Sequence, residues 1–198
     1  CFLTIDNIGA MMPMSIRRNI SVMTILMKYP WLVYGIDTLR RIKDKCFSKE
    51  EFAKKSGVPK RLVRSLLYYL VKFGFIRRKE ENGKTYYEVT ERTHDAFNYI
   101  SCVLSADDKH HLYRIKDSYV MITLKKRRIS AYTISSEILR SVEELIRKEG
   151  NLTLDEISER LGMRKIVIQR AIRILKMLSI VCESVDVNSI RQCNIREE

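Results

Sequence analysis

The chain is organised around residues 48–90, which read SKEEFAKKSGVPKRLVRSLLYYLVKFGFIRRKEENGKTYYEVT. Ser48 and Glu51 have the spacing of a capping box, in which each side chain accepts a hydrogen bond from a free backbone N–H at a helix start. They predict a short helix that ends at Ser56. The turn residues Gly57-Val58-Pro59 follow, because glycine tolerates a reversal of the chain and proline favours the first turn of a new helix. The stretch therefore predicts two helices joined by a tight turn.

The second predicted helix covers residues 59–73 and separates its two faces. At 100° per residue, seven mainly apolar side chains fall on one arc: Leu62, Val63, Leu66, Leu67, Tyr69, Leu70 and Phe73. Six side chains with polar groups fall on the opposite arc, where Val71 is the one aliphatic residue: Lys60, Arg61, Arg64, Ser65, Tyr68 and Lys72. Gly74 has the position of a glycine that ends a helix. We expect the apolar arc to be buried and the polar arc to face a partner.

A β-hairpin is predicted next, because Asn82-Gly83 suits a type I′ turn with positive φ at both central positions. Counting outward from the turn gives four pairs: Glu81 with Lys84, Arg78 with Tyr87, Arg77 with Glu88, and Ile76 with Val89. Two are opposite-charge pairs, one joins a cation to an aromatic ring and one is apolar. All are favourable cross-strand neighbours, so they predict this register.

The helix, turn, basic-faced helix and hairpin together resemble the winged helix-turn-helix of DNA-binding regulators. Two segments are similar to that family's recognition helix and second wing strand: GVPKRLVRSLLYYLVKFGFI and TYYEVTER. The family usually has a glycine shortly after the second segment, where this chain has Thr93 and His94. The resemblance implies a helix that enters a major groove and a hairpin that lies along the DNA backbone.

The DNA contacts implied by this resemblance come from the polar arc and from the hairpin. On the helix they are Lys60, Arg61, Arg64, Ser65, Tyr68 and Lys72, and on the hairpin Arg77, Arg78, Lys79 and Lys84. Arginine is the usual reader of guanine in the major groove. The hairpin cations are expected near phosphate, where they add affinity more than specificity.

An internal repeat indicates a second unit of the same kind. Residues 153–181, TLDEISERLGMRKIVIQRAIRILKMLSIV, align without a gap on residues 48–76 at a shift of 105 positions. Thr153 then falls on Ser48, Glu156 on Glu51 and Gly162 on Gly57. The seven apolar positions of the first helix meet Val167, Ile168, Ala171, Ile172, Ile174, Leu175 and Leu178. The second unit is expected to begin with a helix from Ser135 or Ser136 to Glu149, and to end with wing strands Val181–Val185 and Arg191–Ile195.

The polar arc of the second unit is less uniform than that of the first. Four of its residues are candidates for DNA contacts: Lys165, Gln169, Arg170 and Arg173. Ile166 and Met177 interrupt the arc, and they indicate either a protein partner at this unit or ordinary surface positions. DNA binding and protein binding by the second unit both stay open at this point.

The predicted fold class is mainly α with small β-hairpins, as two tandem winged helix-turn-helix units joined by a helix and a short β segment. The expected division is residues 1–30 as an N-terminal segment with an apolar helix, 31–93 as the first winged-helix domain, 94–134 as the connection, and 135–198 as the second winged-helix domain. The first domain is expected to begin with a helix over Trp31–Lys45.

Within the connection we expect a short helix over Asp95–Leu104, followed by two or three strands in residues 111–134. Turns are expected at Lys116–Ser118 and at Lys125–Arg128. The second turn has the sequence KKRR. Such a run suits a clamp on phosphate and equally suits a solvated hairpin tip.

The charge balance favours a polyanionic partner. The formal net charge is +13 and the sequence pI is about 9.6. Nucleic acid is the first candidate, an anionic membrane surface the second, and solubility alone a third explanation. The leading expectation is a sequence-specific double-stranded DNA-binding protein, most simply a transcription regulator. Its alternatives are a replication initiator or DNA-partition protein, and a protein-binding adaptor in a transcription or chromosome complex.

Enzyme chemistry is not indicated. The five cysteines are scattered without a CxxC pair, and His110-His111 lack neighbouring ligands at metal-binding spacing. No nucleotide-binding glycine loop, HExxH or Gly-flanked serine occurs. We therefore expect no enzyme activity, no cofactor and no metal, and a reducing cytoplasm with association to the nucleoid. A membrane span is not expected either, because Arg17-Arg18 interrupt the first apolar run.

The residues 15–29, SIRRNISVMTILMKY, predict a helix that is apolar over much of its surface. Such a helix has to pack on something, because soluble monomers rarely expose a patch of this kind. A homodimer through residues 15–29 would bury it and would address two DNA half-sites. Burial between the two predicted units would satisfy it as well.

Overall fold

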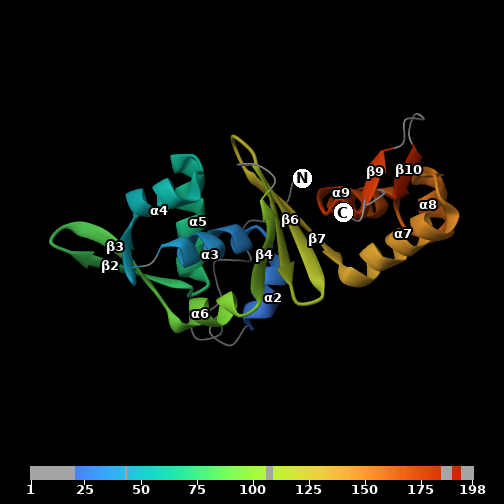
Figure 1. Cartoon of the computed structure of the whole chain (residues 1–198). Coiled ribbons are helices and arrows are strands. Elements are labelled where there is room, and N and C mark those ends of the chain that lie inside the picture. Colours follow the sequence, from blue (N-terminus) through green and yellow to red (C-terminus); the bar gives the residue numbers. More distant parts are fainter. Residues whose placement is uncertain (1–20, 43, 106–108, 184–188, 193–198) are drawn as a thin grey trace, which may run out of the picture. The chain divides into compact units, whose positions relative to one another are not determined.

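The computed structural model describes residues 21–42, 44–105, 109–183 and 189–192, in a mixed α/β fold (Figure 1). Its helices are α2 to α9, and its strands β1 to β10 form three small antiparallel sheets. The chain divides into two compact units, Cys1–Asn98 and Tyr99–Glu198. The expected fold class, mainly α, understates the β content, because segments within residues 100–105 and 110–135 form a four-stranded sheet.

In the described part of the first unit, five helices accompany a three-stranded sheet. In chain order its elements are α2 (Val22–Lys28), α3 (Leu32–Arg41), β1 (Cys46–Ser48), α4 (Lys49–Ser56), α5 (Lys60–Lys72), β2 (Ile76–Glu81), β3 (Lys84–Val89) and α6 (Glu91–Phe97). The sheet order is β1-β3-β2. The helix expected over Trp31–Lys45 ends at Arg41, and the strand Cys46–Ser48 follows it because it pairs with β3.

The predicted local structure of residues 48–90 is confirmed in detail. Ser48 and Glu51 form the capping box, with the Ser48 hydroxyl accepting from Glu51 N at 3.1 Å and the Glu51 carboxylate accepting from Ser48 N at 3.3 Å. Gly57 has a φ of 64°, a left-handed conformation that glycine adopts without steric cost. The hairpin has the expected register, with Ile76 opposite Val89. The turn residues Asn82 and Gly83 have φ values of 52° and 71°.

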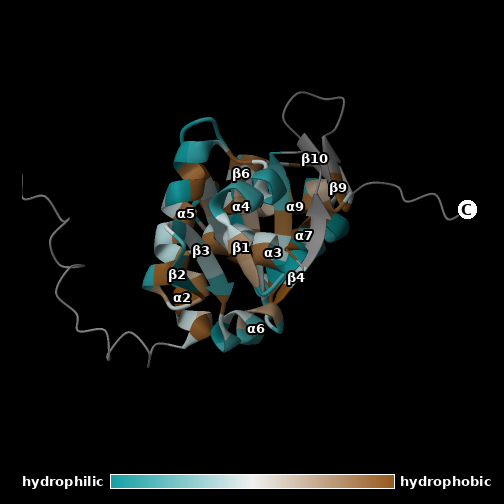
Figure 2. Cartoon of the chain, turned by 90° about the vertical axis from the view of Figure 1, so that its left-hand side faces the viewer, coloured by the Kyte–Doolittle hydropathy of each residue, from teal (hydrophilic) through white to brown (hydrophobic). Residues whose placement is uncertain are grey.

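The two faces of α5 separate as predicted. Its apolar arc is buried at Leu62, Val63, Leu66, Leu67 and Leu70. Along the helix the ribbon changes between hydrophilic and hydrophobic colours as the faces alternate (Figure 2). Burial of one arc therefore sets the rotation of α5 about its axis.

The helix expected at residues 15–29 is described only in part, since residues 1–20 lie outside the described ranges. In α2, Ile25 and Leu26 are buried in the structure. Tyr29, directly after α2, packs on Phe73, directly after α5, with ring centroids 4.9 Å apart. Part of the apolar surface that motivated a dimer is therefore covered, while Met27 is 43% exposed. The dimer itself stays a prediction.

The second unit begins with a four-stranded antiparallel sheet. Its strands, in the order β4-β5-β6-β7, are β4 (Ile100–Ser105), β5 (His110–Ile115), β6 (Ser118–Leu124) and β7 (Ile129–Ser135). The turns expected at Lys116–Ser118 and Lys125–Arg128 are confirmed. The helix expected over Asp95–Leu104 is wrong beyond α6, because Ile100–Ser105 pairs with β5 and takes an extended backbone.

The rest of the second unit repeats the element order of the first. It consists of α7 (Ser136–Glu149), β8 (Leu152–Thr153), α8 (Leu154–Arg160), α9 (Lys165–Met177), β9 (Val181–Glu183) and β10 (Ser189–Gln192), with sheet order β8-β10-β9. The bounds of α7 agree with the prediction, and α9 lies on α5 at the shift of 105 positions. Of the two expected wing strands, residues 184, 185 and 193–195 lie outside the described ranges.

The repeat extends to backbone conformation. Thr153 and Glu156 form a capping box at the positions of Ser48 and Glu51. After α5 the left-handed residue is Gly74, with a φ of 75°, and after α9 it is Ser179, with a φ of 58°. Phe75 N donates to Leu70 O and Ile180 N donates to Leu175 O, each at 2.9 Å. Both helices thus end in the same motif, although only the first has a glycine there.

The helices of the second unit share a hydrophobic core with one side of its four-stranded sheet. Leu112, Met121 and Ile134 of the sheet are buried together with residues of α7, α8 and α9. The predicted connecting segment is therefore part of a folded unit. Within the described ranges, no helix has the length and apolar character needed to cross a bilayer.

Replacing Ser179 by glycine should raise the free energy of unfolding by about 0.5–1 kcal/mol. A left-handed conformation costs an L-residue roughly 1–2 kcal/mol, and glycine avoids this cost. Part of the gain in stability is lost again, because glycine loses more chain entropy on folding than serine does. Urea unfolding of the intact chain, followed by circular dichroism, measures the change.

The matched control for this experiment is Gly74→Ser, the reverse substitution at the equivalent position of the first unit. It should lower the free energy of unfolding by a similar amount, because serine would have to adopt the left-handed conformation of Gly74. A Cβ at Gly74 meets only the Arg92 side chain, at 3.9 Å, so no steric overlap adds to this cost. Equal signs for the two variants would contradict the explanation by backbone conformation.

Candidate functional site

The polar arc of α5 is the most prominent candidate surface of the first unit. Lys60, Arg61, Arg64 and Ser65 are exposed, and Tyr68 has a relative exposure of 60%. Lys72, nearer the end of α5, is half-buried. The six residues predicted on this arc therefore share one face of one helix, with long donor side chains over its first half.

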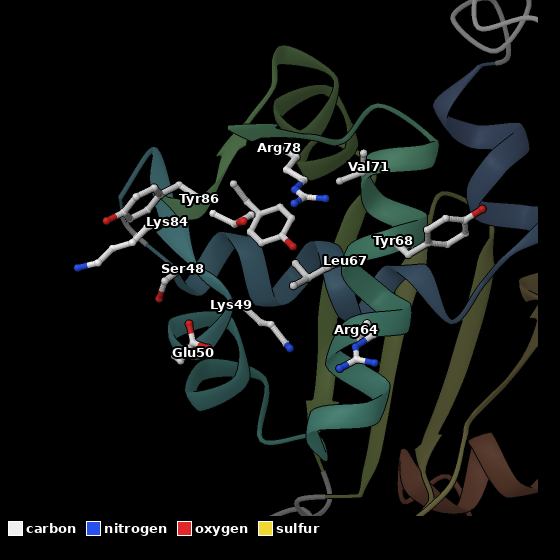
Figure 3. Close-up of a pocket in the computed structure, with 12 residues that line it drawn as sticks. Ser48, Lys49, Glu50, Arg64, Leu67, Tyr68, Val71, Arg78, Lys84 and Tyr86 are labelled. Atoms are coloured by element: carbon white, nitrogen blue, oxygen red, sulfur yellow. The ribbon is translucent and has the colours of Figure 1, made fainter. Parts of the chain in front are cut away.

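A groove of about 600 Å³ lies beside this arc, between α5, the start of α4 and the β2–β3 hairpin (Figure 3). Four cations and one carboxylate line it: Lys49, Arg64, Arg78, Lys84 and Glu50. The rest of the lining is Ser48, Leu67, Tyr68, Val71, Thr85, Tyr86 and Tyr87. The groove is thus a positively charged recess with hydroxyl groups and rings on its walls.

Only some of the four predicted hairpin cations line the groove. Arg78 and Lys84 line the groove, whereas Lys79 does not. Arg77 lines a second depression, at the base of the hairpin and the end of α5, together with Lys72. Only two of the predicted hairpin residues therefore meet Arg64 in one groove.

Ion pairs with neighbouring carboxylates neutralise part of the positive charge of the hairpin. Glu88 binds Lys79 Nζ at 3.0 Å and Lys45 Nζ at 3.8 Å, and it lies opposite Arg77 in the ladder. Arg78 pairs with Glu80 at 2.5 Å. The hydrogen bond from Lys79 lowers the pKa of the Glu88 carboxyl, and the same bond raises the pKa of the Lys79 ammonium. Lys84 and Arg77 make no ion pair with any described residue, so they are less constrained than Arg78 and Lys79.

An aromatic cluster holds the far end of α5. The ring of Trp31 meets Tyr69 edge-on at 5.0 Å, and Tyr69 stacks on Phe73 at 6.1 Å. Lys72 Nζ lies 5.9 Å from the ring centroid of Tyr68 and 5.4 Å from that of Tyr69. Such cation–π contacts hold an ammonium group in place. Lys72 is therefore less available than Arg61 or Arg64.

Most of the groove residues were not predicted as contacts from the sequence, among them Lys49, Tyr86 and Tyr87. A signal for Tyr87 was present, because the hairpin register puts it opposite Arg78. Lys49 is the first residue after the helix cap Ser48, so its place at the start of α4 followed from the capping box. The start of α4 faces the hairpin because β1 pairs with β3. The sequence did not predict this pairing.

In the second unit, the predicted residues lie on α9 in a different environment. Lys165, Gln169, Arg170 and Arg173 are all exposed. Lys165 pairs with Asp155 at 2.7 Å. The guanidinium of Arg170 lies 5.1 Å from the ring centroid of Tyr132 in β7. Burial raises the pKa of Tyr132, and nearby Arg173 and Arg170 oppose this rise.

The two apolar residues that interrupt the α9 arc also differ from each other. Met177 is half-buried against the core of its own unit, so it needs no external partner. Ile166 is 48% exposed. The outward side of α9 is thus partly used inside its own unit.

Three or more metal-ligating side chains do not gather anywhere in the part of the chain that the structure describes. No protein-family model matches the chain, and no curated protein matches its sequence.

The Glu88 carboxyl should titrate below its ordinary pKa of 4.5, because Lys79 donates a hydrogen bond to its ionised form. A carboxyl with a lowered folded-state pKa stabilises the fold above its unfolded-state value, and this contribution is lost as the pH falls through the folded-state value. The Lys79→Met variant should raise the pKa of Glu88 toward 4.5. Carbon-detected NMR titration of the carboxyl group measures it.

Lys84→Met serves as the control, since it removes the same charge from the same hairpin without touching Glu88. Its Glu88 titration should match that of the unmodified chain. An equal rise in both variants would mean that the net charge of the hairpin, and not the Lys79 hydrogen bond, sets the pKa.

Proposed function

We propose that this protein binds double-stranded DNA in a sequence-specific manner and acts as a transcription regulator. The observation that carries the proposal is the exposed polar arc of α5 next to a groove lined by Arg64, Arg78 and Lys84. A major groove admits one α-helix, and long donor side chains on its outer face reach the base edges. The excess of 37 Lys and Arg over 24 Asp and Glu supports a polyanionic partner.

The fold part of the proposal is a pair of tandem winged helix-turn-helix units. The order α3-β1-α4-α5-β2-β3, with the sheet order β1-β3-β2, supports this assignment for the first unit. The equivalent order α7-β8-α8-α9-β9-β10 supports it for the second. In this assignment α5 and α9 are the recognition helices, and the hairpin β2–β3 is the wing.

The two units have unequal roles in the proposal. Arg61 and Arg64 of the first unit read bases, while the hairpin cations Arg78 and Lys84 contact phosphate. On α9 the ion pair of Lys165 and the ring contact of Arg170 favour a smaller contribution to DNA binding. Gln169 and Arg173 stay candidates for backbone contacts.

An adaptor that binds protein through α9 is the second candidate function. The exposed side chain of Ile166 favours it, because apolar side chains are enriched at the centres of protein interfaces. Replication initiation and DNA partition are alternatives within DNA binding. A steep dependence of duplex binding on salt separates DNA binding from a purely adaptor role.

Arg61→Ala and Arg64→Ala should each reduce the preference for a selected duplex over a random one. A bidentate arginine–guanine contact contributes roughly 1–3 kcal/mol of discrimination, which corresponds to a five- to 150-fold loss. The target is first selected from a random duplex pool, and both affinities are then measured at one salt concentration.

The control for these variants is Arg140→Ala, which removes an exposed arginine from α7 in the second unit. It should leave the ratio of the two affinities unchanged. If Arg61→Ala and Arg64→Ala also leave it unchanged, α5 does not read the sequence.

The hairpin should contribute affinity through counterion release. Lys84→Ala should flatten the slope of log K against log salt by about one, and Lys79→Ala by less, because Glu88 already neutralises part of the Lys79 charge. Together they should flatten it by up to about two. Fluorescence anisotropy with a labelled random duplex, repeated over a salt series, measures the slopes.

A third variant, Glu88→Gln, tests the role of the ion pair in this result. It frees Lys79 and Lys45, so the slope should become steeper than in the unmodified chain. A slope that no hairpin variant changes would show that the hairpin stays off the DNA.

A further inference from the structure

The turn between β6 and β7 concentrates positive charge in the second unit. It consists of Lys125, Lys126, Arg127 and Arg128, which we name the cationic turn. The strands on either side pair up to their last residues, Leu124 opposite Ile129. The Lys125 N–H donates to the Arg128 carbonyl at 2.9 Å, so a main-chain hydrogen bond closes the turn. Four consecutive cations thus occupy the tip of one ordered hairpin.

The side chains of the cationic turn are all exposed, and none of them forms an ion pair or ring contact with a described residue. The hairpin of the first unit differs, because Arg78 and Lys79 there are paired with Glu80 and Glu88. On α9, Lys165 is paired with Asp155. Like charges at a tight turn repel one another, and no neighbouring carboxylate offsets the repulsion among the described residues. An anionic partner would offset it.

We propose that the cationic turn is a second DNA contact, which binds the phosphate backbone without reading the sequence. This inference rests on the proposed function and adds a contact from the second unit. Lysine and arginine side chains donate to phosphate oxygens whatever the base sequence is, and the bound counterions that they displace drive binding. The four cationic side chains at one tip suit a partner with regularly repeated negative charges, such as the phosphates along a duplex strand.

A nucleic acid suits this turn better than an anionic membrane surface does. Segments that lie on membranes combine basic side chains with exposed apolar ones. The apolar residues beside the cationic turn, Leu124 and Ile129, are half-buried. All four residues of the turn itself are charged.

The test compares two double variants of the intact chain, each of which removes one lysine and one arginine. Lys126→Ala with Arg127→Ala changes the cationic turn, whereas Arg147→Ala with Lys148→Ala changes two exposed residues at the end of α7. The first should flatten the slope of log K against log salt on random duplex by up to about two. The second should leave that slope near the unmodified value. The ratio of selected to random affinity should stay constant in the first variant, because phosphate contacts carry no sequence information.

Urea unfolding midpoints equal to that of the unmodified chain establish that both variants are folded. An unchanged slope in the turn variant overturns the inference, and so does an equal change in both variants, which would reflect net charge alone.

Vesicles containing phosphatidylserine provide a further arm: lost vesicle binding by the turn variant with an unchanged DNA slope would assign the turn to a membrane. If the unmodified chain binds duplex with a steep slope that the turn variant keeps, this inference fails while the proposed function stands. If the unmodified chain shows no salt-dependent binding to duplex, both fail.

Discussion

The first unit depends on the burial of one arc of α5. Leu62, Leu66 and Leu70 follow one another at intervals of four residues, and all three are buried. A helix is stiff over this length, so burying one side fixes its rotation and turns Arg64 outward. The hairpin begins from the same core, since Ile76 and Val89 are buried where its strands start and end. One apolar cluster thereby positions both walls of the groove.

Much of this arrangement could be predicted from the sequence because it is encoded locally. A two-residue turn at Asn82-Gly83 leaves one register for the hairpin, and the charge pairs Arg77 with Glu88 and Glu81 with Lys84 agree with it. The capping box at Ser48 fixes the start of α4 through two hydrogen bonds that lie within three residues. The polar arc of α5 follows from helical periodicity alone. The candidate residues on that arc were therefore accessible without a structure.

The remainder depends on contacts between segments that are distant in the chain. Ile100–Ser105 forms a strand because β5 offers it a ladder, and local sequence does not report that ladder. Arg170 lies over Tyr132 because the four-stranded sheet shares a core with α9. The repeat predicted α8 and α9 correctly but carried no information about this covering sheet. Similar backbones consequently present different outer surfaces.

The position of Glu88 has a consequence for how fast the proposed complex forms. At distances well beyond the 3.0 Å that separates Lys79 from Glu88, a partner responds mainly to charge that is not already compensated. Salt screens this response over the Debye length, about 8 Å at physiological ionic strength. Long-range steering then comes from free cations such as Arg61 and Lys84, while Lys79 is masked by its carboxylate. Only after collision can phosphate compete with Glu88 for that ammonium. In the proposed complex, the unmasked charge of the hairpin would govern the rate of capture, and its masked charge would govern how long the captured DNA stays bound.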